Sequence, residues 1–175
     1  MTPFALLQDI AQRCRSHAAE LPSRTEAVEY WRGVGFVLSG RRFVAPMNDI
    51  TEILTAPKLT LVPGVKNWVE GVANVRGRLI PVMDLAAFLG EPHGTQRPMR
   101  TLIIEKGELL NGLVVDAVLG MQHFPVDSME SAESVELTDR VAPFVEGVFE
   151  RNGEQWPVFS FDSLAKDEKY MDIAV

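Results

Sequence analysis

The spacing of hydrophobic positions divides the chain into two parts with different periods. Up to residue 21 the apolar side chains recur at alternating steps of three and four: Phe4, Leu7, Ala11, Cys14, Ala18 and Leu21. This spacing predicts an amphipathic helix over residues 3–21. Thr2 can cap that helix, Pro3 suits its first position, and Pro22 ends it. We expect the stripe to pack on its own domain, and docking to a partner or to another copy stays open as the alternative.

From residue 31 onward the period falls to two, which predicts short strands joined by turns. The pattern predicts four hairpins, over residues 34–46, 67–85, 100–120 and 144–162. The last of them closes at Asn152-Gly153, a dipeptide that accepts the positive φ angles of a type I′ turn. Many short strands with little helix after the first segment are typical of a barrel or sandwich.

The segments between the hairpins carry weaker signals. Residues 86–90 predict a brief helix that Gly90 ends, and residues 48–54 a helical turn. Two prolines exclude a helix from residues 57–64, so this segment is expected to be extended. The acidic stretch 127–143 predicts a mobile loop, and the charged last ten residues are expected to fray.

Parts of the chain repeat each other without a gap. Val69-Glu70-Gly71-Val72 recurs as Val145-Glu146-Gly147-Val148, and Pro81-Val82 recurs as Pro157-Val158, in both cases 76 positions later. A second, weaker repeat matches Gly40 with Gly107 and Asp49 with Asp116, in both cases 67 positions later. The repeat predicts two similar small β-barrels that share a core, because each would be marginal alone.

The two copies differ at the tip of the repeated hairpin. Arg76-Gly77 in the first copy stands where the second copy has Asn152-Gly153, an ordinary turn dipeptide. A turn does not require arginine, so Arg76 calls for a separate explanation.

Composition and charge argue against several classes of function, among them nucleic-acid binding and a membrane-spanning protein. The chain has 175 residues, of which 46% are hydrophobic and 23% charged, which suits one domain or two small intertwined subdomains. A net charge of −7 and a pI of about 5.0 argue against nucleic-acid binding. No apolar run approaches the ~18 residues of a membrane span, and charges interrupt the N-terminal apolar stretch as they would not in a signal peptide. We therefore expect a cytoplasmic protein; its single cysteine, Cys14, excludes an internal disulfide.

The side chains that could carry catalysis do not converge along the sequence. His17, His93 and His123 stand far apart, and none has a second ligand at metal spacing. Neither a G-x-S-x-G nucleophile motif nor a phosphate-binding loop is present. We therefore expect no catalytic residue, no metal and no cofactor.

Three aspartates form the one constellation that suggests chemistry. Asp84, Asp116 and Asp162 each follow an apolar run, and carboxylates at strand ends can hold magnesium or accept a phosphoryl group. A phosphoacceptor or magnesium-dependent enzyme is therefore one alternative function. The simpler interpretation, which we favour, is that they cap the turns or helices after the strands. A generic SH3-like peptide-binding module is the other alternative; its groove would need exposed aromatic side chains, for which Trp68 and Trp31 are candidates.

Residues 62–90 resemble the signature of the CheW family of chemotaxis coupling proteins. The matching elements are Val62-Pro63, Val69-Glu70-Gly71, Asn74-Val75-Arg76-Gly77 and Pro81-Val82-Met83-Asp84-Leu85. The resemblance extends over most of residues 31–165. The N-terminal extension resembles that of the CheW-like adaptors of type IV pilus twitching systems.

This resemblance implies a mainly β fold: two intertwined SH3-like five-stranded β-barrel subdomains with an N-terminal α-helix. It divides the chain into a helical extension (1–30), a CheW-like domain (31–165) and a C-terminal tail (166–175). It also implies a non-enzymatic scaffold that couples the cytoplasmic tip of a methyl-accepting chemoreceptor to the regulatory domain of a CheA-like histidine kinase. Such a protein would be cytoplasmic, recruited to membrane-associated receptor arrays without inserting into the membrane, and would control twitching motility.

The resemblance also marks a site for partner binding. It places Ile50, Glu52, Gly71 and Arg76 near the partner surfaces. We expect Arg76 and Glu52 to form a partly exposed ion pair beside a hydrophobic groove, in which the arginine orients the partner and apolar neighbours supply contact energy. A plain salt bridge between two loops is the alternative. The predicted partner-binding residues are Ile50, Glu52, Gly71, Asn74, Val75, Arg76 and Leu79.

Overall fold

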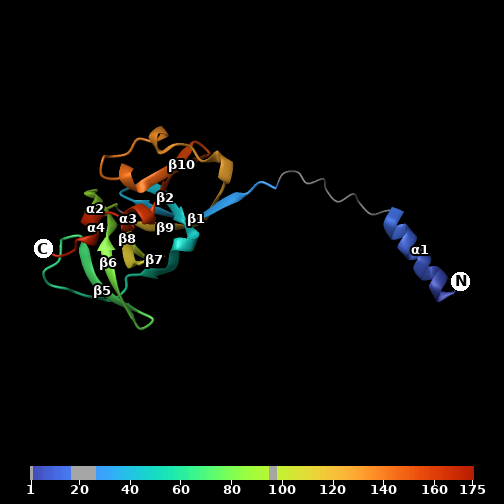
Figure 1. The fold of residues 1–175 in the computed structure, drawn as a ribbon, viewed down its shortest axis with the longest axis horizontal. Coiled ribbons are helices and arrows are strands. Elements are labelled where there is room, and N and C mark those ends of the chain that lie inside the picture. The colour runs from blue at the N-terminus through green and yellow to red at the C-terminus, as the bar shows by residue number, and fades with distance from the viewer. Residues whose placement is uncertain (1, 17–26, 95–97) are drawn as a thin grey trace.

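The computed structural model describes residues 2–16, 27–94 and 98–175, and two β-sheets make up most of it (Figure 1). The five-stranded sheet has the order β10-β11-β2-β1-β9 and consists of β1 (Tyr30–Leu38), β2 (Arg41–Pro46), β9 (Ala117–Pro125), β10 (Val145–Arg151) and β11 (Glu154–Phe159). The six-stranded sheet has the order β3-β7-β8-β6-β5-β4 and consists of β3 (Ile50–Thr55), β4 (Leu59–Thr60), β5 (Val69–Val75), β6 (Arg78–Asp84), β7 (Arg100–Lys106) and β8 (Leu109–Val115). The predicted fold class, mainly β with an N-terminal helix, is confirmed.

Short helices connect and flank the strands. The α-helices are α1 (Pro3–Ser16), α2 (Leu85–Leu89), α3 (Phe161–Ala165) and α4 (Glu168–Met171). The 3₁₀ helices are η1 (Met47–Asp49), η2 (Val126–Ser128), η3 (Ala132–Ser134) and η4 (Ala142–Phe144). Gly90 ends α2 in the left-handed conformation, as predicted. No helix in the described part of the chain has the length and apolar character needed to cross a membrane.

The two sheets share one strand order, and it follows the sequence repeat. The order β5-β6-β8-β7-β3 matches β10-β11-β2-β1-β9, and in each sheet a parallel contact joins the repeated hairpin to a hairpin from the other half of the chain, β6 to β8 and β11 to β2. The halves therefore exchange hairpins. The sequence repeat predicts two barrels with a shared core but does not predict this exchange, because the parallel contacts join segments distant in sequence.

A bulge glycine occupies equivalent places in the two copies of the repeat. The β5–β6 register shifts between Val69 and Gly71, and the β10–β11 register shifts between Val145 and Gly147. Beside each bulge another segment pairs with the strand that carries it. Thr60 pairs with Val72 of β5 in one copy, and Glu130 pairs with Val148 of β10 in the other. The acidic stretch 127–143 is therefore tied to β10 and contains 3₁₀ turns, so the expectation of a mobile loop is wrong.

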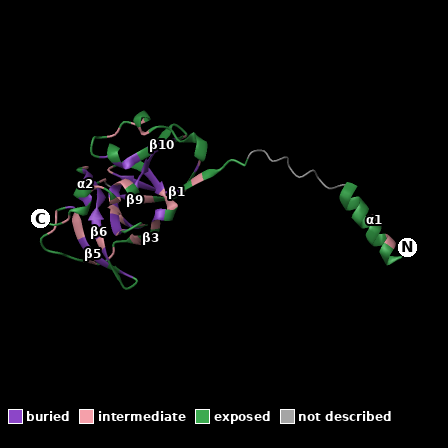
Figure 2. Ribbon diagram, viewed as in Figure 1, coloured by how far each residue is buried: buried purple, intermediate pink, exposed green. Residues whose placement is uncertain are grey.

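The main core lies between the sheets and draws on both (Figure 2). Phe36 and Phe43 from one sheet stack with ring centroids 5.7 Å apart, and they pack in one cluster with Leu102 and Leu113 from the other. All four are at most 2% exposed, and burial of each such side chain contributes roughly 1.5–3 kcal/mol. This shared core confirms that neither sheet is an independent layer.

The C-terminal tail packs against the domain, so the expectation that it frays is wrong. Tyr170 on α4 is 1% exposed and stacks on Trp68 at 5.7 Å. Its hydroxyl accepts a hydrogen bond from the Asn111 side chain, and burial raises its pKa well above the ordinary value. Beyond it, the amides of Lys66 and Val175 donate to the carbonyls of Ile173 and Gly64.

Two local predictions need correction. The helical turn expected over 48–54 is limited to η1, and β3 follows it, because Ile50–Thr55 finds a pairing partner in β7. The third hairpin does not end at residue 120: the chain bends at Asp116, and β9 continues to Pro125 along β1. Exposed residues on this edge strand obscure the alternation that identifies strands.

Helix α1 matches its predicted start and cap but not its predicted packing. The Ala5 amide donates to Thr2 Oγ1 at 3.3 Å. The helix is described to Ser16, so Ala18, Leu21 and the stop at Pro22 lie outside the described residues, as does His17. No residue of α1 is buried, and the helix lies apart from the sheets in Figure 1. For the described part of the stripe, from Phe4 to Cys14, the expectation that it packs on its own domain is therefore wrong.

Candidate functional site

A groove of about 890 Å³ runs between β3 and the β5–β6 hairpin of the six-stranded sheet. Its apolar lining includes Leu54, Val62, Val72 and Leu79. Leu79 is 73% exposed and Leu61 beside the groove is 83% exposed, so hydrophobic surface is open to solvent here. The remaining lining residues are Glu52, Thr55, Pro57, Lys58, Thr60, Asn74, Val75 and Arg76. An apolar groove with charged groups at its rim is typical of a protein-binding surface.

Strand β3 positions the acidic member of the site. From Glu52 to Thr55 its side chains alternate between half-buried and exposed positions, so Glu52 and Leu54 share one half-buried face. A β-bulge between Ile50 and Glu52 turns Ile50 toward the main core instead. Leu54 packs against the small cluster formed by Ala73, Val75, Ile80, Val82 and Ile103. Because Glu52 stands two residues before Leu54 on the same face, its carboxylate lies at the rim of the groove.

The hairpin tip positions the basic member. Val75 pairs with Arg78, so Arg76 and Gly77 form a two-residue turn, and both have positive φ (53° and 80°). The Gly77 amide donates to the Asn74 side chain at 2.9 Å, which braces the turn. Arg76 Nε lies 3.4 Å from Glu52 Oε2, and the Arg76 side chain is 80% exposed. Most of its guanidinium N–H donors therefore face solvent and are open to a partner.

Among the described residues, the Glu52–Arg76 pair is present in one copy of the repeat alone. In the second copy Asn152-Gly153 forms the same turn, with φ of 54° and 78°. Strand β9, which pairs with β1 as β3 pairs with β7, contains no aspartate or glutamate. A left-handed conformation costs an L-residue such as arginine about 1 kcal/mol, whereas an exposed ion pair contributes about 0–1 kcal/mol. Folding therefore gains nothing from arginine at this turn.

The structure brings together five of the predicted partner-binding residues, since Glu52, Asn74, Val75, Arg76 and Leu79 all line the groove. It places the other two elsewhere. Ile50 packs against the main core, and Gly71 is buried at the β5 bulge beneath β4. A direct partner contact by either stays a prediction.

Sequence reasoning missed the half of the groove that the 54–62 segment provides. Leu54, Pro57, Lys58, Thr60 and Val62 all contribute to its lining. The alternation along β3 was a usable signal, because it places Leu54 on the face of Glu52. The path of residues 57–62, which pack against β5 next to Gly71, had no comparable signal in the sequence.

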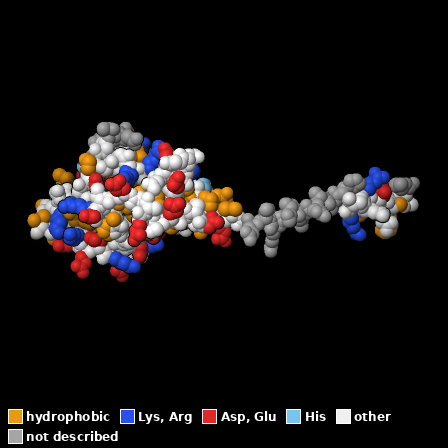
Figure 3. Space-filling model, turned by 90° about the horizontal axis from the view of Figure 1, so that it is seen from above, with side chains coloured by type: hydrophobic (Ala, Val, Ile, Leu, Met, Phe, Trp, Pro, Cys, Tyr) orange, Lys and Arg blue, Asp and Glu red, His pale blue; other side chains and the backbone are white. Residues whose placement is uncertain are grey.

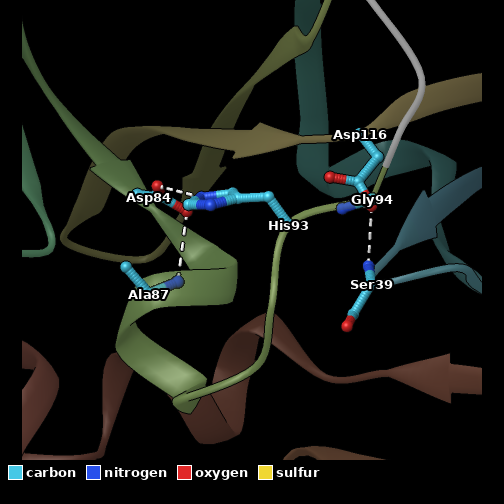
Figure 4. A network of polar contacts seen from close by, with 6 residues as sticks. All are labelled: Ser39, Asp84, Ala87, His93, Gly94 and Asp116. Atoms are coloured by element: carbon cyan, nitrogen blue, oxygen red, sulfur yellow. Dashed lines mark hydrogen bonds and ion pairs between the residues drawn. The ribbon is translucent and has the colours of Figure 1, made fainter.

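Two of the three strand-end aspartates, Asp84 and Asp116, accept hydrogen bonds from backbone amides (Figure 4). Asp84 caps α2 by accepting from the Ala87 amide at 3.1 Å, and its other oxygen lies 2.5 Å from His93 Nε2. Asp116 accepts from the amides of Ser39 (2.7 Å) and Gly94 (3.0 Å). Both are buried, and the capping interpretation is confirmed for Asp84. Asp116 instead accepts from amides of two distant segments that precede it in the chain.

Asp162 has a different role. It is exposed on α3 and pairs with Lys166 at 2.7 Å, a hydrogen bond that lowers its pKa. The residue that caps α3 is Ser160, which lies 76 positions after Asp84 and so occupies the same place in the repeat. No group of three or more histidine, cysteine and acidic side chains in the described part of the chain could hold a metal ion. The geometry gives no support to the magnesium alternative.

The two candidate aromatic side chains, Trp68 and Trp31, do not form a peptide-binding groove. Trp68 is 7% exposed and packs edge-on against Phe88 at 5.0 Å. Trp31 is half-buried and packs against Phe149 at 5.2 Å. Among described residues, the lining of the groove includes no aromatic side chain. The exposed aromatic cluster that the SH3-like alternative needs is therefore not formed by these candidates.

A half-buried carboxylate lies beside Asp84. Burial, and then the negative charge of Asp84, raise the pKa of Glu70 above its ordinary value of 4.5. A raised pKa means that the folded state holds the proton more tightly than the unfolded chain does. The ionised Glu70 side chain therefore destabilises the fold at neutral pH.

Replacing this carboxylate is expected to stabilise the protein. Glu70→Gln should raise the free energy of unfolding at pH 7 by less than about 1 kcal/mol, because solvent screens the site. The gain should shrink as the pH falls through the raised pKa and vanish below 4.5, where the parent side chain is protonated in both states. Urea unfolding across this pH range measures it, with Glu150→Gln on the exposed side of β10 as the control. A Glu70→Gln variant less stable than its parent at pH 7 would contradict this account.

The fold corresponds to a known family. A family model for the CheW-like domain matches residues 32–169, and the chain belongs to that family. The resemblance found in residues 62–90 is thereby confirmed.

Individual proteins of this family are similar to the chain over most of its length. The chain is 51% identical over 175 residues to Protein PilI of Pseudomonas aeruginosa, an alignment that covers 99% of this chain and 97% of the relative. It is 22% identical to the chemotaxis protein CheW of Thermotoga maritima over 81% of this chain and 92% of that protein. The crystal structure of the scaffolding protein TtCheW from Thermoanaerobacter tengcongensis superposes with a TM-score of 0.70 at 26% identity, and covers 83% of this chain and 99% of that one.

Proposed function

We propose that this protein is a non-enzymatic adaptor in a chemotaxis-like system that controls type IV pilus twitching motility. It binds the regulatory domain of a CheA-like histidine kinase and the cytoplasmic tip of a methyl-accepting receptor. It works in the cytoplasm and is recruited to receptor arrays at the membrane. Family membership supports the adaptor role, and the similarity to PilI along the whole chain supports the pilus pathway.

One observation carries the binding role of the groove. Arginine occupies a left-handed turn position that asparagine fills in the second copy, and its ion pair with Glu52 has no counterpart among the described residues of that copy. The fold does not need this pair, yet it stands at the rim of the exposed apolar groove. A rigid guanidinium fork beside exposed leucine side chains would fix the orientation of a partner, and the apolar surface would supply the contact energy.

The test replaces Arg76 with the residue that the protein itself uses in the second copy. Arg76→Asn should weaken binding of the kinase regulatory domain or of the receptor tip by roughly tenfold or more, because one anchoring charge is lost. The melting temperature should stay the same or rise, since asparagine tolerates the left-handed conformation. Isothermal titration calorimetry against each purified partner, together with thermal unfolding, measures both effects.

The control is Arg78→Asn, on the other side of Gly77. Arg78 lies 3.9 Å from Glu105 and is not part of the groove lining, so this change should leave both affinities nearly unaltered. Unchanged binding of both partners by Arg76→Asn would rule out the proposed role of the groove. A collapsed melting temperature with unaltered affinity would assign the pair to folding instead.

A further inference from the structure

The helix α1 presents an apolar face that the described part of the chain does not cover. Phe4, Leu6, Leu7 and Ile10 are 70%, 49%, 64% and 48% exposed, and no residue of the helix is buried. Figure 3 shows hydrophobic side chains at the surface of this helix, away from the domain. A helix of 14 residues is marginal in water unless its apolar face is covered. The sequence therefore provides a surface for which the described part of a single chain supplies no partner.

This helix lies outside the part shared with the wider family. The CheW-like model begins at residue 32, whereas the alignment with the Pseudomonas aeruginosa relative covers 99% of the chain and so includes α1. The groove of the six-stranded sheet does not involve α1. A partner of α1 can therefore bind independently of a partner in the groove.

The side chains of α1 suit a second copy of the same helix. The stripe consists of Phe4, Leu7, Ala11 and Cys14, at the 3-4-3 spacing of a helix-pairing seam. In an antiparallel pair Phe4 faces Cys14 of the other copy, and Leu7 faces Ala11. Each layer then combines a large side chain with a small one, which keeps the helices evenly spaced.

A parallel pair fits less well. It would stack Phe4 on Phe4 and Leu7 on Leu7 at one end and leave only small side chains at the other. Ile10 lies beside the seam. A parallel pair would direct it toward Arg15 of the other helix, whereas the antiparallel pair brings the two Ile10 side chains together.

The charges on α1 also favour a protein over a lipid surface. Asp9 and Arg13 pair with each other at 2.9 Å on the polar side, which leaves the seam without charge. The polar face therefore lacks the rich basic character of membrane-surface helices, and the net charge of −7 opposes an anionic bilayer.

We infer that α1 is a self-association element that pairs antiparallel with α1 of a second copy of this chain. A contact between two helices of this length is small, so the pairing is weak and reversible. It would cross-link adaptors that are already close together without occupying their grooves.

Sedimentation equilibrium of the purified full chain tests this inference without receptor or kinase, so its outcome is independent of the proposed function. The average mass should rise with concentration for the parent and for Gln12→Asp, a control on the polar face. Leu7→Asp, which places a charge in the seam, should weaken association at least about tenfold and leave the domain's melting temperature unchanged. A parent that stays monomeric, or a Leu7→Asp variant that associates as strongly as the parent, would overturn it. Monomers that instead bind vesicles of anionic phospholipid would also overturn it, in favour of a membrane role.

Cysteine cross-linking tests the orientation, because Cys14 is the single cysteine and is exposed. Under mild oxidation, Phe4→Cys should give a covalent dimer between position 4 of one copy and Cys14 of the other, identified by mass spectrometry of the linked peptides. The parent should cross-link poorly, since the two Cys14 thiols lie at opposite ends of the pair. Efficient Cys14–Cys14 linkage in the parent would show that the pair is parallel and contradict the arrangement inferred above.

Discussion

Replacing Gly71 with alanine is expected to destabilise the protein by about 2–4 kcal/mol. Gly71 has a φ of 143°, which L side chains rarely adopt, and a Cβ there would lie 2.5 Å from the carbonyl oxygen of Thr60. That oxygen belongs to the β4 backbone and cannot move without breaking the pairing with β5. The groove should open at the same time, because Thr60 and Val62 line it. Urea unfolding gives the change in stability.

The matched control for this prediction is the equivalent glycine of the repeat. At Gly147 φ is not positive, and the nearest atom that a Cβ would meet is the flexible Met129 side chain, at 2.7 Å. Because that side chain can move aside, and the nearest backbone atom, the Glu130 carbonyl oxygen, lies at 3.1 Å rather than 2.5 Å, Gly147→Ala should cost about 1 kcal/mol. Equal losses at the two positions would show that the close approach of β4 does not set the requirement for glycine.

Truncating Tyr170 to alanine is expected to cost roughly 3–5 kcal/mol, a large fraction of the stability of a domain of this size. The ring fills the space between Trp68 and Phe88, with centroids 5.7 and 5.1 Å away. Its loss would leave a cavity and also remove the hydrogen-bond partner of Asn111 Nδ2, while Asn111 Oδ1 already lacks a partner among the described residues. Thermal and urea unfolding measure the effect.

Two further variants separate the contributions of Tyr170. Tyr170→Phe keeps the ring and should cost about 1–2 kcal/mol, the penalty for one unsatisfied buried donor. Met171→Ala, at a 55% exposed neighbouring position, should change stability by less than about 0.5 kcal/mol. If Tyr170→Ala behaved like Met171→Ala, the tail would not be part of the folded core.

The sequence predicted most clearly those features that depend on local chemistry. Asn152-Gly153 and Gly90 specify their turn and helix end through the backbone conformations they allow, and both appear as expected. The Arg76–Glu52 contact followed from a family resemblance together with the difference between the two copies, and the structure places the pair at 3.4 Å. Its role in partner binding stays a prediction.

Features that depend on distant contacts were missed. Residues 48–54 predict a helical turn where the structure has β3, because the partner of that strand, β7, lies about fifty residues away and leaves no local trace. The C-terminal tail reads as charged and solvent-exposed, yet one side chain, Tyr170, holds it in the core. In both cases tertiary packing outweighed the composition of the segment.

The exchange of hairpins between the halves of the chain makes the protein indivisible. Neither half should fold when expressed alone, because each sheet contains strands from both halves. The isolated half would expose long unpaired strand edges, which are prone to aggregation. Unfolding should therefore be a single transition, in which both sheets melt together. A ligand that stabilises the groove of the six-stranded sheet would then protect the amides of the five-stranded sheet against hydrogen exchange to a similar degree.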